Sequence, residues 1–329
     1  MFVGIVARSS RRTSAALGAV CCLLLARTVS GQAFIPAPGE GDVTVTYQNA
    51  RSKGHLDLNG NLMSGESGHD STQTHAAAWD IDFGLSRRLA VSASLPFVAA
   101  RYSGASPHLV DVNGAPSEID DGSYHRAVQD FNVRVLLNLK ARPIAITSFV
   151  EAIVPSHHYP SLAHSAVGKD LRGFVMGAAV GGFLDRLLPG LVFQSQMSYA
   201  IFQEVVGIRP NHTRIESELG YFITPRVSLR FLESFQYTYR GLDLISFTPP
   251  NVHIHGHPEI AFSRQYFLNH DRLQRINYLN LGGGVGVGLN DSLDIFVSGA
   301  KTAWGQNVHP LRGFNVGANI HFRTRRATP

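Results

Sequence analysis

Thiols and long apolar runs are scarce in this chain of 329 residues. Its two cysteines, Cys21 and Cys22, both lie near the start, which excludes disulfide scaffolds, Cys-ligated metals and Cys nucleophiles from the rest of the sequence. One stretch, residues 15–26, is uniformly apolar, and it is shorter than the ~20 residues of a membrane-spanning helix. From Asp42 onward no helical period is sustained, which argues against a helical fold.

Residues 1–31 have the layout of a cleaved signal peptide. Arg8, Arg11 and Arg12 precede the apolar run, and small residues up to Gly31 provide a cleavage site. We therefore expect cleavage after Gly31. A lipoprotein site at Cys21 is a weaker alternative, because no large aliphatic residue lies three positions upstream. A twin-arginine signal is also disfavoured, because no bulky apolar residue follows the arginine pair and that route carries folded cargo.

Removing this segment changes the charge balance. The chain has 29 Lys plus Arg against 24 Asp plus Glu, and four of the basic residues, Arg8, Arg11, Arg12 and Arg27, lie in the signal. The remaining 25 basic residues almost balance the 24 acidic ones. The mature chain therefore gives no basis for nucleic-acid binding, which needs basic residues clustered on one face.

Residues 313–322 alternate strictly, with apolar side chains at every even position and polar or small ones at every odd position. In a strand these two sets lie on opposite faces. A C-terminal strand with one apolar face that ends on an aromatic residue, here Phe322, is typical of the closing strand of an outer-membrane β-barrel. We expect the barrel-assembly machinery to recognise this strand.

About twelve stretches with the same period of two follow one another between turn signals, and their connections alternate in length. Short turns are expected at 86–88, 141–143, 185–190, 224–226 and 290–292, and long loops at 52–69, 103–124, 156–169, 205–211, 241–271 and 305–311. The pattern predicts an all-β fold, a transmembrane antiparallel barrel of about twelve strands over residues 42–323, with short periplasmic turns and longer extracellular loops. This fold places the protein in the cell outer membrane, in contact with its lipid. A soluble β-sandwich is the alternative, but sandwich strands are shorter, about five or six residues.

Both chain ends flank the predicted barrel. Residues 32–41, which contain Pro36 and Pro38, are expected to form a periplasmic N-terminal segment and are a candidate plug. Residues 324–329 are expected to form a basic C-terminal tail.

Three places fit the strand pattern poorly. Pro96 interrupts a strand and has no N–H to donate, so it needs a bulge or a position near the rim. Residues 171–184 are apolar on both faces, which leaves their orientation open. Glu233 falls on an apolar face, where an acid at the bilayer midplane costs a few kcal/mol, so we expect a bulge or a slip in register there.

The hairpin of residues 79–97 has a Gly-Leu turn that leads into a strand ending in Leu-Pro-Phe. It resembles a hairpin of the phenol-degradation-pathway (MetA-pathway) family of outer-membrane β-barrel proteins. The resemblance covers these residues, and the rest of the chain matches the family in plan. It implies a transporter-like barrel, with aromatic compounds as one class of cargo.

If the apolar faces point to lipid, the charged side chains of the strands point into the lumen. These lumen-lining candidates are Asp80, Asp82, Asp130, Arg134, Glu151, Arg172, Arg214, Glu216, Glu218, Arg230, Asp294 and His321. Both signs occur in similar number, which indicates internal ion pairs rather than a pore for one ionic class. Twelve strands leave a narrow lumen, which residues 32–41 or the loop 241–271 could close.

The sequence therefore predicts a passive outer-membrane channel or transporter for an unidentified small molecule, without a cofactor and without enzymatic activity. A closed-lumen barrel with a structural or ligand-binding role is the main alternative. A lipid hydrolase is a weaker one: His69, Asp70 and Ser71 have a suggestive spacing, but no partner that would orient the histidine is evident on a neighbouring strand.

Two further motifs have simple structural interpretations. His253, His255 and His257 would share one face of an extended chain, a spacing able to bind a transition metal, but a solvated loop is favoured and no metal site is predicted. The glycine run 282–286 is similar to a phosphate loop, yet it lies inside a predicted strand with no helix after it. We expect it to allow close approach of another side chain or strong curvature.

Overall fold

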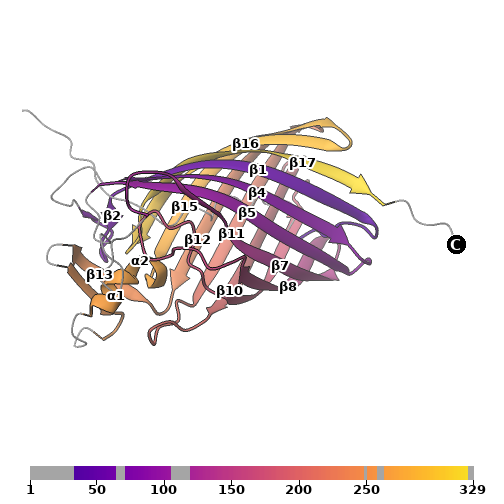
Figure 1. The fold of residues 1–329 in the computed structure, drawn as a ribbon. Coiled ribbons are helices and arrows are strands. Elements are labelled where there is room, and N and C mark those ends of the chain that lie inside the picture. The colour runs from indigo at the N-terminus through magenta and orange to yellow at the C-terminus, as the bar shows by residue number, and fades with distance from the viewer. Residues whose placement is uncertain (1–32, 64–70, 105–118, 248–249, 258–262, 325–329) are drawn as a thin grey trace, which may run out of the picture.

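The computed structural model describes residues 33–63, 71–104, 119–247, 250–257 and 263–324, so the expected signal peptide and the end of the tail lie outside it. Twelve antiparallel strands close into a barrel (Figure 1). The barrel strands are β1 (Glu40–Lys53), β4 (Ser71–Gly84), β5 (Leu89–Ser103), β6 (His125–Val128) with β7 (Asp130–Lys140), β8 (Ile144–Pro155), β9 (Gly173–Phe183), β10 (Leu191–Phe202), β11 (His212–Thr224), β12 (Val227–Thr238), β15 (Asn277–Asn290), β16 (Leu293–Gln306) and β17 (Leu311–Arg323). The elements β6 and β7 both pair with β5 and together make one strand of the barrel.

Each strand pairs with its neighbours in the chain, and β1 with β17 completes the ring. This last ladder runs from Glu40 opposite Arg323 to Ser52 opposite Leu311, so the barrel begins two residues before the expected Asp42. Closure leaves no edge, and every strand can pair its backbone groups on both sides, as a bilayer requires. The predicted all-β barrel with five short turns and six longer connections is confirmed.

The outer surface of the barrel is apolar because the strands alternate. On β7, for example, the side chains of Phe131, Val133 and Val135 are exposed while that of Arg134 is buried in the lumen. Exposed Leu, Ile, Val and Phe side chains continue this belt over the other strands. Such a surface suits lipid, and it places the barrel in the outer membrane. None of the helices in the described part of the chain is long and apolar enough to cross a bilayer.

The long connections fold together into a cap over the extracellular end. It contains the hairpins β2 (His55–Leu56) with β3 (Leu62–Met63) and β13 (Leu242–Phe247) with β14 (Pro250–Ile254), and the short helices α1 (Arg264–Leu268) and α2 (His270–Leu273). Figure 1 shows these elements gathered at the end of the barrel opposite the C-terminus. Buried apolar residues hold the cap together, including Leu242, Leu244 and Phe267.

The N-terminal segment lies inside the periplasmic end of the barrel. Ala33 is fully buried against Ala145 and Ala179, and its carbonyl accepts a hydrogen bond of 2.8 Å from Thr147 Oγ1. At Gly181 an added Cβ would lie 2.9 Å from the Cβ of Ala33. A side chain at Gly181 would therefore displace the segment, which explains why the inner face of β9 is built from small residues.

The residues 171–184 left unassigned by the sequence now have an orientation. Phe174, Met176 and Val180 are exposed on the outer face, whereas Val175 and Ala179 are buried in the lumen. Because the inward positions are small, both faces of this strand read as apolar in the sequence. The alternation is regular all the same.

The bulge expected at Pro96 is present in the partner strand. β5 pairs Ser94 with Asn132 on β7, and Phe97 with Val128 on β6. Two residues of β5 between these pairs therefore face three on the partner, which is the count of a β-bulge. The break between β6 and β7 lies beside the residue that has no N–H to donate.

The bulge or slip expected at Glu233 is wrong. Glu233 pairs with Ser217 on β11 and with Leu281 on β15 without a shift in register, on the outer face beside the exposed Phe231. A slip of one residue would turn every side chain of the strand to the opposite face. That would cost more than one poorly placed acid, so the regular ladder is retained.

Replacing this acid should stabilise the barrel. We expect Glu233→Gln to raise the free energy of unfolding by about 1 kcal/mol, because it removes a charge from a lipid-facing surface. Urea titration of the protein refolded into lipid vesicles measures this, with Glu204→Gln in an exposed loop as the control. A lower stability for Glu233→Gln would contradict a lipid-facing position.

Candidate functional site

The lumen contains two cavities at different levels. One of about 430 Å³ lies in the periplasmic half and one of about 250 Å³ in the extracellular half. The predicted lumen residues that line the periplasmic cavity are Asp80, Asp82, Arg134, Glu218, Arg230, Asp294 and His321, and those that line the extracellular cavity are Asp130, Arg134, Glu151, Arg214 and Glu216. Arg172 is the exception, because its side chain is exposed just before β9 begins. Arg134 lines both cavities and so marks the boundary between them.

A row of polar side chains crosses the lumen at this boundary. Arg134 Nε donates to Glu151 Oε2 at 2.8 Å, and Arg134 Nη1 donates to Gln196 Oε1 at 3.4 Å. Gln196 in turn donates to Glu216, and the Arg134 guanidinium lies 4.2 Å from the centre of the Phe149 ring. The row joins β7 to β8, β10 and β11 at the level where the linings of the two cavities meet at Arg134.

The arginine and glutamate at its centre are almost fully buried, with 7% and 5% of Arg134 and Glu151 exposed. Ions this deeply buried are tolerated when they are paired and hydrogen-bonded, because desolvation is otherwise too costly. The guanidinium meets that condition by contacting the carboxylate through two nitrogens, with the second contact at 2.6 Å. The pair therefore holds the boundary in one geometry.

Carboxylates dominate the periplasmic cavity. Glu218 Oε1 lies 3.5 Å from Arg230 Nε, and His321 bridges two acids, with Nδ1 2.5 Å from Asp42 and Nε2 2.9 Å from Asp294. The acids lining this cavity are Asp42, Asp80, Asp82, Glu218 and Asp294, against the bases Arg134, Arg230 and His321. Acidic and basic lumen residues are similar in number in the sequence as a whole, but they are distributed unevenly between the two cavities.

Sequence reasoning missed Asp42. It lies at the point taken as the first residue of the barrel, where the alternation gives no direction. The feature that could have identified Asp42 is its pairing partner, because β1 pairs it directly with the predicted lumen residue His321 on β17.

The glycine run on β15 has the role expected for close approach of a side chain. Gly286 points into the lumen, where an added Cβ would lie 2.8 Å from Ser228 Oγ and 3.2 Å from Arg230 Nη2. The absence of a side chain on β15 leaves space for the guanidinium of the neighbouring strand. The run lies within β15 (Asn277–Asn290), so no phosphate loop forms there.

The extracellular cavity is amphipathic. Val98, Ile153 and Phe202 line it together with the cationic side chains of Lys169 and Arg214. It opens below the cap, next to the ends of the strands.

The three histidines of 253–257 do not gather around a common point. His255 Nδ1 lies 2.7 Å from Asp243 Oδ2, and Arg275 Nε donates to Asp243 Oδ1 at 2.7 Å. The short turn that follows β14 interrupts the extended run, so His253 and His257 do not follow His255 along one face.

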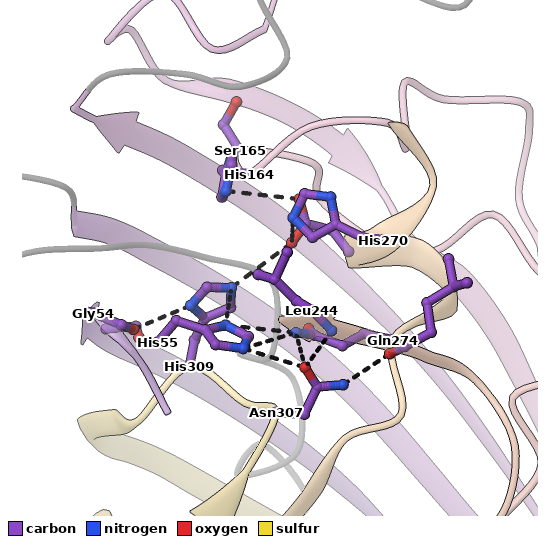
Figure 2. A network of polar contacts seen from close by, with 12 residues as sticks. Gly54, His55, His164, Ser165, Leu244, His270, Gln274, Asn307 and His309 are labelled. Carbon is purple, nitrogen blue, oxygen red and sulfur yellow. Dashed lines mark hydrogen bonds and ion pairs between the residues drawn. The ribbon is translucent and has the colours of Figure 1, made fainter. Parts of the chain in front are cut away.

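Another histidine cluster, which sequence reasoning did not find, is buried in the cap: His55, His164, His270 and His309 (Figure 2). Its members come from four different connections, so no motif with a regular local spacing indicates it in the sequence. Burial, with His309 and His270 close by, lowers the pKa of His55 well below its usual value. Burial raises the pKa of the nearby Asp120, but hydrogen bonds from His164 and Ser165 outweigh this and hold that pKa well below its usual range.

Comparisons with known proteins bear on the fold. An outer-membrane channel from Pseudomonas putida F1 has a TM-score of 0.64 and 12% identity, over 90% of this chain and 100% of that one. The chain has the fold of an outer-membrane channel barrel. The translocator domain of the autotransporter NalP from Neisseria meningitidis has a TM-score of 0.45 and 11% identity, over 87% of this chain and 90% of that one. The CymD monoaromatic hydrocarbon channel has a TM-score of 0.41 and 8% identity, over 88% and 90%.

No family model matches the chain, and no curated protein matches it. The transporter-like barrel implied by the resemblance of residues 79–97 is nevertheless the fold observed.

Breaking the central ion pair should be costly. We expect Glu151→Leu to lower the free energy of unfolding by about 3 kcal/mol, because it leaves the Arg134 charge buried and unpaired. The double variant Arg134→Met with Glu151→Leu should recover most of that loss. Urea titration of the refolded wild type and of both variants measures these differences.

An exposed ion pair is the control for this cycle. Glu204 and Arg209 lie 3.0 Å apart with about half of each side chain exposed, so Glu204→Leu should change stability by less than about 1 kcal/mol. Equal losses for the single and double lumen variants would show that the pair does not act as a unit.

Proposed function

We propose that this protein is a passive outer-membrane channel for small molecules. The observation that carries the proposal is the pair of cavities at two levels of the lumen, whose linings meet at the row of side chains around Arg134. Rotation of side chains is enough to join the two levels, whereas a wall of backbone would require the barrel itself to deform. The fold shared with an outer-membrane channel supports this function.

The extracellular cavity indicates the class of molecule. At about 250 Å³ it lies just below the usual range for small-ligand sites, which suits a molecule with one ring or a short chain. Its apolar residues would contact the body of such a molecule, and Arg214 or Lys169 would attract an anionic or hydroxyl group. We infer a small amphipathic molecule, with aromatic acids and phenols as the first compounds to test.

Passage requires the central row to open. The contact between Arg134 and Gln196 is long, at 3.4 Å, and is the weakest link of the row. A hydrogen bond from a charged donor contributes about 1.5–3 kcal/mol at good geometry and less at this length, so we expect this bond to break before the shorter Arg134–Glu151 pair does. Gln196 is therefore the side chain that we expect to move.

A closed-lumen binding barrel is the second candidate, and a specific observation favours it. Ala33 and the residues after it fill part of the periplasmic end, where Phe34 and Pro36 line the larger cavity. In that case the cavities would hold a ligand without passing it on. In both cases we propose that β17, with its strict alternation, is the strand recognised during barrel assembly.

Conductance separates the two candidates. The mature chain refolded into a planar bilayer should give discrete current steps, which Ser198→Trp should abolish because Ser198 lines the extracellular cavity. Met197→Trp is the matched control: Met197 is the preceding residue on β10, and 59% of it is exposed on the outer face. A heat-shifted gel band checks that each barrel is closed. A folded protein without current steps would favour the binding barrel. Equal conductance of both variants would show that the current does not pass through the extracellular cavity, and would contradict the proposed path.

A further inference from the structure

The cap contains a cluster with the composition of a metal centre. His164, His270 and Asp271 are fully buried, and one ligand atom of each lies within 4.8 Å of the others. Asp271 is the hub: its carboxylate oxygens lie 3.5 Å from His270 Nε2, 3.7 Å from His309 Nε2 and 4.0 Å from His164 Nε2. Three imidazole nitrogens therefore face one carboxylate.

These distances fit ligands around a cation better than they fit hydrogen bonds. Hydrogen bonds of nitrogen to oxygen have lengths of about 2.7–3.2 Å. Tetrahedral zinc sites with ligands at about 2.0–2.1 Å place neighbouring ligand atoms about 3.3–3.4 Å apart. The three distances around Asp271, 3.5, 3.7 and 4.0 Å, all exceed that tetrahedral edge, so the side chains would move inward by a few tenths of an ångström on binding an ion.

The other ring nitrogen of each histidine is fixed by an acceptor. His270 Nδ1 lies 2.5 Å from the Phe267 carbonyl, and His309 Nδ1 lies 3.1 Å from the Gly54 carbonyl. A carbonyl can only accept, so Nδ1 carries the proton in each ring, and in the neutral ring Nε2 presents a lone pair. Figure 2 shows these rings converging from separate segments.

The third histidine has a carboxylate in the same position. His164 Nδ1 lies 3.3 Å from Asp120 Oδ2, which also accepts from the backbone N–H of His164. A ligating histidine whose second nitrogen contacts a carboxylate or a carbonyl is the usual arrangement of zinc sites. All three histidines of the cluster have this support.

We propose that His164, His270 and Asp271 bind one divalent transition-metal ion of the zinc class. Imidazole nitrogens with one carboxylate form a ligand set suited to zinc, and calcium and magnesium, which prefer oxygen, are disfavoured. Three protein ligands would leave the fourth position of the tetrahedron to a water molecule. The site ties together the connections between β8 and β9 and between β12 and β15, with Asp120 from the β5–β6 connection behind it and His309 from the β16–β17 connection 3.7 Å from the same carboxylate.

Zinc binding by the full mature chain, folded in detergent micelles, tests this site. After treatment with a chelator and readdition of zinc, we expect one tightly held zinc per chain, a raised melting temperature and slower trypsin cleavage in the cap. Cobalt(II) in place of zinc should give the visible absorption bands of a tetrahedral ion. Asp271→Asn, which keeps the size of the side chain, should lose the bound metal and the cobalt bands while still giving a heat-shifted band.

The matched control lies on the same connection as His164. His164→Gln should lose binding, whereas His158→Gln should keep it, because 97% of the His158 side chain is exposed. A folded wild-type chain that binds no zinc and gives no tetrahedral cobalt spectrum would overturn the proposal in favour of a metal-free network of polar side chains around Asp271. Equal binding by the His164 and His158 variants would overturn it too. Neither result depends on conductance, so the site and the channel can fail separately.

Discussion

The structure depends on one constraint, the need of every backbone N–H and C=O group within the bilayer for a partner inside the protein. The β1–β17 ladder meets it by joining the first and last strands, which lie at opposite ends of the sequence. Once the ring is closed, the register of each strand determines which side chains face lipid and which face the lumen, because a shift of one residue exchanges the two faces. This is why Glu233 stays on the outer face and why the break required by Pro96 is confined to the partner strand.

A closed ring of twelve strands creates an interior that must be filled or solvated. This chain fills it in three ways, at three levels. The N-terminal segment enters from the periplasmic end, the row around Arg134 crosses the middle, and the long loops cover the extracellular end. Two cavities remain between these levels. Opening the lumen therefore requires rearranging its contents, because the wall itself is fixed by its ladders.

Much of the wall could be predicted from the sequence because alternation is a local property. Each strand shows in its own residues which face is apolar, and this gave the lumen direction of Glu216 or Arg230 without knowledge of their neighbours. Arg172 departed from that pattern because it precedes its strand and is not bound by the alternation. Asp42 was missed because β1 starts at Glu40, within residues whose sequence resembles a linker, so the alternation gave no direction there.

The cap could not be predicted in the same way, since many of its contacts join residues that are distant in sequence, some of them more than a hundred positions apart. His55 and His309 are neighbours in space and are separated by nearly the whole barrel in sequence. The three histidines with regular local spacing, around His255, are the ones that do not converge. Local spacing gives information about a single strand or helix. A barrel, however, brings the ends of all its strands together at two rims, where residues from different connections meet.

That geometry has a consequence for how the cap can be stabilised. Every connection is already held at both ends by the barrel, so ordering it costs far less chain entropy than ordering a free loop. A single buried contact point shared by several connections then restricts all of them together. The apolar cluster around Leu244 and the polar cluster around Asp271 are two such points on neighbouring segments of the cap. An apolar cluster tolerates some repacking of its side chains, but a polar cluster requires particular pairs of atoms to stay close together. The polar cluster accordingly fixes the relative positions of the connections more narrowly than the apolar cluster does.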